Sequence, residues 1–261
     1  MSRKLSTQQG DQADVPRRSS DCVGRKRICR RPHRVRRGVC TALAVAAVVP
    51  AVRAGSPWQV WFDQAASVWV SAGTIRAGQS LRYSLEDDDV STYYMEVGYG
   101  GCLQDWLSAG ISYRQQYDRR DGGWIRENRP YADLTIRWET ALVTISDRSR
   151  LEYRSRQNAE ATFRYRNKLS LQYDGWHNAA GARPYFSTEA FVDESVRLRE
   201  RDRTRSTLGL KLDPGRWFGR AREPSAGWAV SVDCSAMTQR TRKGGQWRDE
   251  HIASLKIGIA F

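Results

Sequence analysis

The 261-residue chain lacks several features that identify common classes of protein. After residue 54 it holds two cysteines, two histidines and no apolar run of membrane-helix length. The spacing of Cys102 and Cys234 fits no metal-binding motif, and the pair is interpreted as free thiols or as a disulfide permitted by export. The Gly-Gly pairs are typical of turns and no phosphate-binding motif follows them. No cofactor is therefore predicted.

A large excess of charge is also missing from most of the chain. The formal net charge is +14, but residues 1–54 carry 13 Lys or Arg and 3 Asp or Glu, so the remaining residues have a net charge of only +4. A basic surface for nucleic acid consequently has little support.

The basic segment resembles an export signal. An apolar run at 38–52 follows Arg34, Arg36 and Arg37, and a small-residue site precedes cleavage after Ala54. A basic start, a short apolar region and such a site indicate a secretory signal peptide. We predict a leader at 1–54, with the signal peptide at about 35–54 and residues 1–34 upstream of a true start at Val35, followed by one domain at 55–261.

What the remaining chain does contain is alternation of polar and apolar residues. From 147 to 174, charged residues occupy every second position and Leu151, Tyr153, Phe163, Tyr165, Leu169 and Leu171 occupy the others. A period of two predicts β-strands with one charged and one apolar face. Segments of about ten residues with this pattern recur to Phe261, and we count eleven.

A soluble sandwich and a membrane barrel both satisfy alternation alone. Three features favour the barrel: aromatic residues near strand ends, charges of both signs on the polar face, and a chain that ends on an alternating strand. The predicted fold is an all-β, single antiparallel transmembrane β-barrel of 10 to 12 strands, with short periplasmic turns and longer charged outer loops. The predicted outer loops include residues 118–128 and 240–250. Twelve strands are favoured because single-chain bacterial barrels have an even number.

The end of the chain resembles the carboxy-terminal assembly signal of Gram-negative outer-membrane barrels. Leu255, Ile257, Ile259 and Phe261 alternate with smaller or polar residues. The segments at 129–138, 149–154, 164–169 and 184–191 resemble an uncharacterised family of bacterial outer-membrane barrels known only as a domain of unknown function. The resemblance implies the fold and an outer-membrane location, with outer-membrane lipid, lipopolysaccharide and the barrel-assembly machinery as partners. It supplies no catalytic residues.

The polar face is the candidate site. We predict a lattice of charges in the lumen formed by Arg137, Arg148, Arg150, Glu152, Arg154, Arg164, Arg166, Lys168, Glu189, Asp193, Arg205 and Lys211. One interpretation is a plug, in which paired side chains fill a narrow barrel. The other is a filter, in which excess arginine attracts a small anionic solute.

Two other functions stay open. An enzyme acting on outer-membrane lipid or lipopolysaccharide would need a histidine-centred site, for which only His177 and His251 remain, the latter near Ser254. A structural or adhesive barrel could present its outer loops to a partner. The sequence predicts no catalytic residue and no metal site, and it leaves the oligomeric state open.

Overall fold

The computed structural model describes residues 57–70, 73–120, 123–175, 181–193, 203–213, 229–243 and 246–261. The predicted leader lies outside this part of the chain, as do His177 and Trp176. Within it, no helix is long and apolar enough to cross a membrane.

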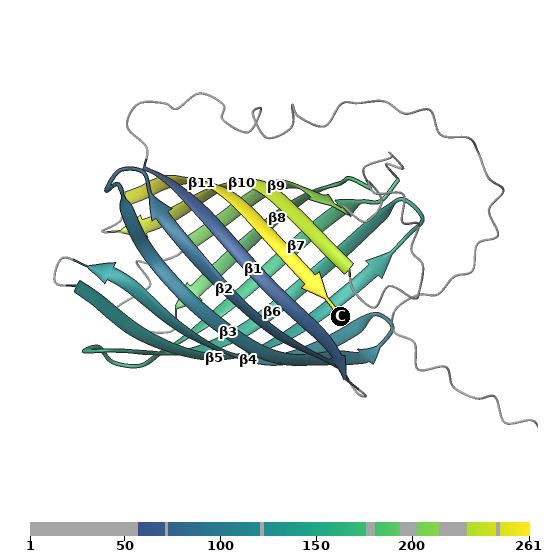
Figure 1. The fold of residues 1–261 in the computed structure, drawn as a ribbon, viewed down its shortest axis with the longest axis horizontal. Helices are drawn as coiled ribbons and strands as arrows, with labels where there is room; N and C mark the ends of the chain where they lie inside the picture. The colour runs from purple at the N-terminus through teal and green to yellow at the C-terminus, as the bar shows by residue number, and fades with distance from the viewer. Residues whose placement is uncertain are drawn as a thin grey trace, which may run out of the picture. The chain divides into compact units, whose positions relative to one another are not determined.

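The described residues form eleven β-strands that close into one barrel (Figure 1). The strands are β1 (Trp58–Val70), β2 (Gly73–Ser84), β3 (Asp89–Gln104), β4 (Leu107–Arg120), β5 (Gly123–Glu139), β6 (Val143–Arg156), β7 (Thr162–Tyr173), β8 (Arg183–Asp193), β9 (Arg203–Leu212), β10 (Ala229–Lys243) and β11 (Gln246–Ala260). Each of the eleven segments recognised by alternation corresponds to one strand, so the predicted all-β barrel is confirmed.

The strand number differs from the favoured value of twelve. Neighbouring strands pair antiparallel throughout, except that β1 pairs in parallel with β11, from Trp58 opposite His251 to Ser67 opposite Ala260. Figure 1 shows these two strands side by side, with the carboxy terminus at the far end of β11. The preference for twelve was wrong because one parallel pair closes an odd number of strands without leaving an unpaired edge.

The connections also differ from the prediction. The barrel end that holds Phe261 is here called the C-terminal rim. Of the described connections, 105–106 and 140–142 lie at this rim, and 85–88 and 157–161 lie at the opposite one. The charged segments expected to form long outer loops at 118–128 and 240–250 are mostly strand, because their residues continue the ladder, as Arg240 does opposite Asp249.

Alternation divides the barrel wall into two faces. Exposed apolar side chains point outward on every second residue, among them Leu81, Val97, Ile111, Leu134, Leu151, Leu169, Phe186, Leu208 and Ile259. Asp147 and Asn167 interrupt this face and hydrogen-bond to each other at 2.6 Å. The inward face carries most of the buried polar and charged residues, so the interior of this barrel is largely ionic rather than apolar.

Candidate functional site: a charged lumen

The strands β5 to β9 form a charged wall of the lumen. Their inward positions hold thirteen Arg or Lys and six Asp or Glu, an excess of seven positive charges. These are Arg129, Arg137, Arg148, Arg150, Arg154, Arg156, Arg164, Arg166, Lys168, Arg183, Arg203, Arg205 and Lys211, with Glu127, Asp133, Glu139, Glu152, Glu189 and Asp193. Most of the carboxylates therefore face more than one cation.

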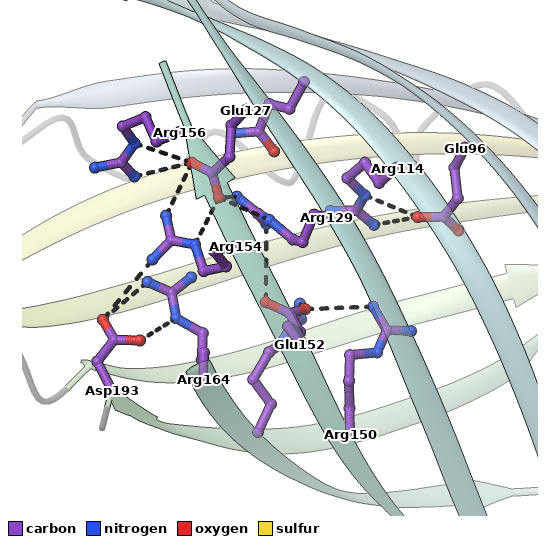
Figure 2. A network of polar contacts seen from close by, with 12 residues as sticks. Glu96, Arg114, Glu127, Arg129, Arg150, Glu152, Arg154, Arg156, Arg164 and Asp193 are labelled. Atoms are coloured by element: carbon purple, nitrogen blue, oxygen red, sulfur yellow. Dashed lines mark hydrogen bonds and ion pairs between the residues drawn. The ribbon is translucent and has the colours of Figure 1, made fainter. Parts of the chain in front are cut away.

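Glu127 is the first centre of the lattice. Its carboxylate accepts hydrogen bonds from Arg129 at 2.7 Å, Arg154 at 2.6 Å and Arg156 at 2.9 Å, and the residue is 0% exposed. Figure 2 shows the three guanidinium groups converging on it from β5 and β6. Each bond is charge-assisted, and together they offset the cost of burying the carboxylate.

A second centre lies on β6. Glu152 is also 0% exposed and bonds Arg166 at 2.6 Å, with Arg150 at 3.7 Å and Arg129 at 3.9 Å. Figure 2 shows Glu152 between Arg129 and Arg150. The antiparallel register places Glu152 opposite Arg164, so neighbouring strands deliver cations to it from both sides.

The third and fourth centres lie on β8. Glu189 forms ion pairs with Arg148, Arg166 and Arg205 at 3.0, 2.7 and 3.5 Å. Asp193 forms a bidentate pair with Arg164, with N–O distances of 2.5 and 3.0 Å. The charged wall is thus continuous from β5 to β9.

Part of the lattice belongs to a closed set of contacts that runs once around the barrel, here called the lumen ring. Every strand contributes at least one member. In chain order they are Gln59, Trp61, Arg82, Tyr94, Arg114, Tyr131, Arg150, Glu152, Arg166, Glu189, Arg205, Gln239 and Glu250.

Aromatic rings hold the first half of the lumen ring together. The Arg82 guanidinium lies 3.8 Å from the ring centroid of Trp61 and 5.6 Å from that of Tyr94. Arg114 lies 4.0 Å from Tyr94 and 5.9 Å from Tyr131. Cations over aromatic faces are attracted by the ring quadrupole, so this half is held together mainly by cation–π contacts.

Carboxylates hold the second half together. Arg150 lies 3.8 Å from the ring centroid of Tyr131 on β5 and 3.7 Å from Glu152. Glu152 bonds Arg166, which bonds Glu189 at 2.7 Å, and Glu189 lies 3.5 Å from Arg205. This half is a chain of alternating charge.

Amide side chains close the lumen ring across the parallel seam. Arg205 donates to Gln239 at 2.7 Å, Gln239 donates to Glu250 at 2.7 Å, and Gln59 donates to Glu250. Trp61 donates its indole N–H to Gln59 at 2.8 Å and also lies 4.8 Å from the Arg205 guanidinium. The side chains of Trp61 and Arg205 meet although two strands lie between them, so the lumen is narrow at this level.

The remaining strands, β1 to β4 with β10 and β11, form a wall of different character, here called the small-residue wall. Toward the C-terminal rim many of its inward positions carry glycine, alanine or serine. These are Ala65, Ser67, Gly78, Gly98, Gly100, Gly110, Ser112, Ser231, Ser254 and Gly258. Short side chains leave the adjacent part of the lumen unfilled by this wall, whereas the opposite wall projects long ones.

The structure places each residue of the predicted lattice on an inward position of β5 to β9. Nine of the twelve form ion pairs with one another. By contrast, Arg137 lies apart in a pair with Glu139 at 3.5 Å, and Lys211 donates to Gln172 at 2.8 Å. Lys168 faces the lumen opposite Glu189. Leu255, Ile257, Ile259 and Phe261 all lie on the outer face, which fits an apolar final strand and does not test its role in assembly.

Sequence reasoning missed Glu127 and Arg129, as well as Arg114 and the aromatic members of the lumen ring. Glu127 lay within a segment interpreted as a loop. Continuing the alternation back from Tyr131 would have assigned it to the same face as Asp133. The pairing of Trp61 with Arg205 has no signal in sequence, because residues more than a hundred positions apart meet only when the barrel closes.

No catalytic arrangement is evident in the described part of the chain. His251 stacks against Trp58 on the outer face, with ring centroids 5.2 Å apart, whereas Ser254 lies on the inner face. The two cannot form a dyad. The described residues contain no group of three or more His, Cys, Asp or Glu side chains suited to a metal ion.

The sequence and fold of this chain also have counterparts among known proteins, which differ in how closely they match. A search of the curated proteins found no match to this chain. The solved structures that it resembles include the NanC porin, with 13% identity, a TM-score of 0.46, and coverage of 79% of this chain and 98% of that one. They also include an anion-selective porin from Comamonas acidovorans, with 10% identity, a TM-score of 0.33, and coverage of 72% and 59%. Scores of this size establish no shared function. A family model described as "Protein of unknown function (DUF2490)" matches residues 58–217, more than half of the chain, and the protein belongs to that family.

Proposed function

We propose that this protein is an outer-membrane β-barrel of a Gram-negative bacterium, exported by a cleaved signal peptide, whose lumen binds or passes small anionic solutes. The outer face supports the location. Apolar side chains cover it, with Tyr153 and Phe163 in contact near one rim, 5.2 Å between centroids, and Trp138 and Tyr173 near the other. Apolar bands between aromatic girdles are typical of barrels in a bilayer.

The observation that carries the proposed solute class is the excess of positive charge on the charged wall. Thirteen cations share six carboxylates there, so ion pairing within the wall leaves net positive charge. Among the described residues, Lys168 and Arg203 form no ion pair within 4.0 Å. Positive charge on the wall of a narrow lumen raises the local concentration of anions and disfavours cations.

The test is ion selectivity in a planar bilayer. With a potassium chloride gradient across the membrane, we expect a reversal potential of the sign for chloride preference. The double variant Lys168→Gln, Arg203→Gln removes two cations without separating an ion pair between described residues, and we expect it to shift the potential toward zero. A wild-type barrel that prefers potassium would contradict the proposed solute class.

A second candidate is a barrel without transport, and a specific observation favours it. Glu127 and Glu152 are fully buried among their arginine partners, as expected of a lumen that its own side chains plug. The same bilayer experiment separates the two: a folded barrel that carries no current in either direction would favour the plug. Proteoliposome swelling in anionic solutes provides an independent readout of passage.

A further inference from the structure

We propose that Ser80, Arg82 and Gln116 form a binding subsite in the lumen for a hydroxylated carboxylate, a carboxylate that carries at least one hydroxyl group on a neighbouring carbon. All three lie on the small-residue wall, where the lumen ring is made of cation–π contacts. The inference rests on the proposed function, because it names the class of anion that the lumen holds.

Arg82 differs from the other arginines of the lumen ring. Arg114, Arg150 and Arg166 each bond a carboxylate at 2.5 to 2.6 Å. Arg82 forms no ion pair within the described part of the chain, whereas Arg205 pairs with Glu189 at 3.5 Å. The Nε of Arg82, like that of Arg205, has no hydrogen-bond partner there. Its guanidinium is held over Trp61, so its position is fixed while its donors stay available to a solute.

Two buried polar atoms beside Arg82 also lack partners. Ser80 is 1% exposed and Gln116 is 5% exposed, and neither the Ser80 Oγ nor the Gln116 Oε1 bonds any described residue. The amide nitrogen of Gln116 does donate to Asp118, at 2.8 Å, which fixes the amide with its oxygen free. Buried polar atoms are almost always paired in native proteins, so atoms left free beside a lumen indicate a ligand site.

The strand register brings these atoms together. Ser80 on β2 and Gln116 on β4 both lie opposite Tyr94 of β3, one on each side of it. Arg82 follows Ser80 by two residues on the same face of β2. The subsite therefore spans three consecutive strands, with Tyr94 on the middle one.

The chemistry of the three groups selects the ligand. A guanidinium binds a carboxylate through two parallel hydrogen bonds. The Gln116 oxygen can only accept, so the ligand must bring a donor, and a hydroxyl group supplies one while also accepting from Ser80. A carboxylate without a hydroxyl can accept from Ser80 but leaves the buried Gln116 oxygen unpaired, and sites built around such an atom reject ligands that lack the matching group.

The experiment is calorimetry on the full-length mature barrel folded in detergent, with lactate and propionate as probes. The two differ by one hydroxyl group. We expect wild type to bind lactate about tenfold more tightly than propionate. Gln116→Met and Ser80→Ala should reduce the ratio of the lactate affinity to the propionate affinity toward one. Arg82→Gln should lower the affinity for both anions.

Arg240→Gln is the matched control, because Arg240 lies on the outer face in an exposed pair with Asp249. It should leave both affinities unchanged. Equal affinity of wild type for lactate and propionate, or a ratio unaffected by Gln116→Met, would overturn the subsite. Either result together with chloride preference in the bilayer leaves the proposed function standing. A barrel that prefers potassium yet binds lactate through Arg82 would overturn the proposed function instead.

Discussion

The charged wall and the small-residue wall face each other across one lumen and are held together in different ways. Between β5 and β9, long side chains of both signs bond one another, with Glu127, Glu152 and Glu189 each serving several arginines. Between β1 and β4, Arg82 and Arg114 rest on aromatic rings, and many of the inward residues toward the C-terminal rim are small. The first wall projects long side chains into the lumen, and the second projects mainly short ones toward the C-terminal rim.

This difference separates arginines that stabilise the wall from arginines that can bind a solute, which the alternation of arginine in the sequence does not distinguish. A guanidinium bonded to a buried carboxylate has its donors occupied and its charge balanced, so it stabilises the wall more than it attracts a solute. The Arg82 guanidinium lies on an aromatic face and pairs with no carboxylate among the described residues, so its hydrogen-bond donors are not occupied there. We therefore expect the loss of a shared carboxylate on the charged wall to change stability, and substitutions at the small residues and at Arg82 of the small-residue wall to change passage and binding.

The largest expected effect is on the charged wall, from Glu127→Ala. The substitution leaves the three guanidinium groups that it bonds without their shared carboxylate, and unpaired buried charge costs about 3 to 5 kcal/mol. Urea unfolding in lipid vesicles measures the loss. Glu139→Ala on the same strand is the control, since that side chain is 63% exposed, and we expect a change within about 0.5 kcal/mol. Equal losses for the two variants would refute the distinction between buried and exposed pairs.

The next effect tests passage beside the small-residue wall. Ala65 points inward beside Gly78, so Ala65→Trp should fill the adjacent lumen and lower the single-channel conductance on the order of tenfold. Ala66→Trp places the same side chain on the outer face, where an aromatic residue is tolerated. Conductance that falls equally in both variants would show that tryptophan disturbs the barrel rather than the passage.

The smallest expected effect compares the aromatic residues of the two walls. Trp61→Leu removes the contacts at 3.8 Å and 4.8 Å that hold Arg82 and Arg205, and we expect a loss of about 1 to 2 kcal/mol. Phe191→Leu on the charged wall removes the ring whose centroid lies 4.7 Å from the Arg166 guanidinium and 5.2 Å from that of Arg205. Both guanidinium groups are also held by carboxylates. The loss for this variant in urea unfolding should be smaller by about 1 kcal/mol, and a larger loss for Phe191→Leu would reverse the comparison.

The sequence by itself determined the strands and the division of their faces. A period of two sends successive side chains to opposite sides whatever the neighbours are, so Arg150, Glu152 and Arg166 could be placed on one face from spacing alone. The limits of the strands were less certain, because charged residues at 118–128 resemble a loop until a partner strand continues the ladder through them.

Only the tertiary structure decided how many strands close the barrel and which residues meet across it. Closure depends on the parallel pairing of β1 with β11, and strand spacing along the chain carries no record of that direction. The same closure sets Trp61 beside Arg205 and leaves Arg82 on an aromatic ring while Arg166 takes two carboxylates. Alternation fixes a side chain's face, but its partner depends on strand register and barrel diameter, which arise from the assembled wall.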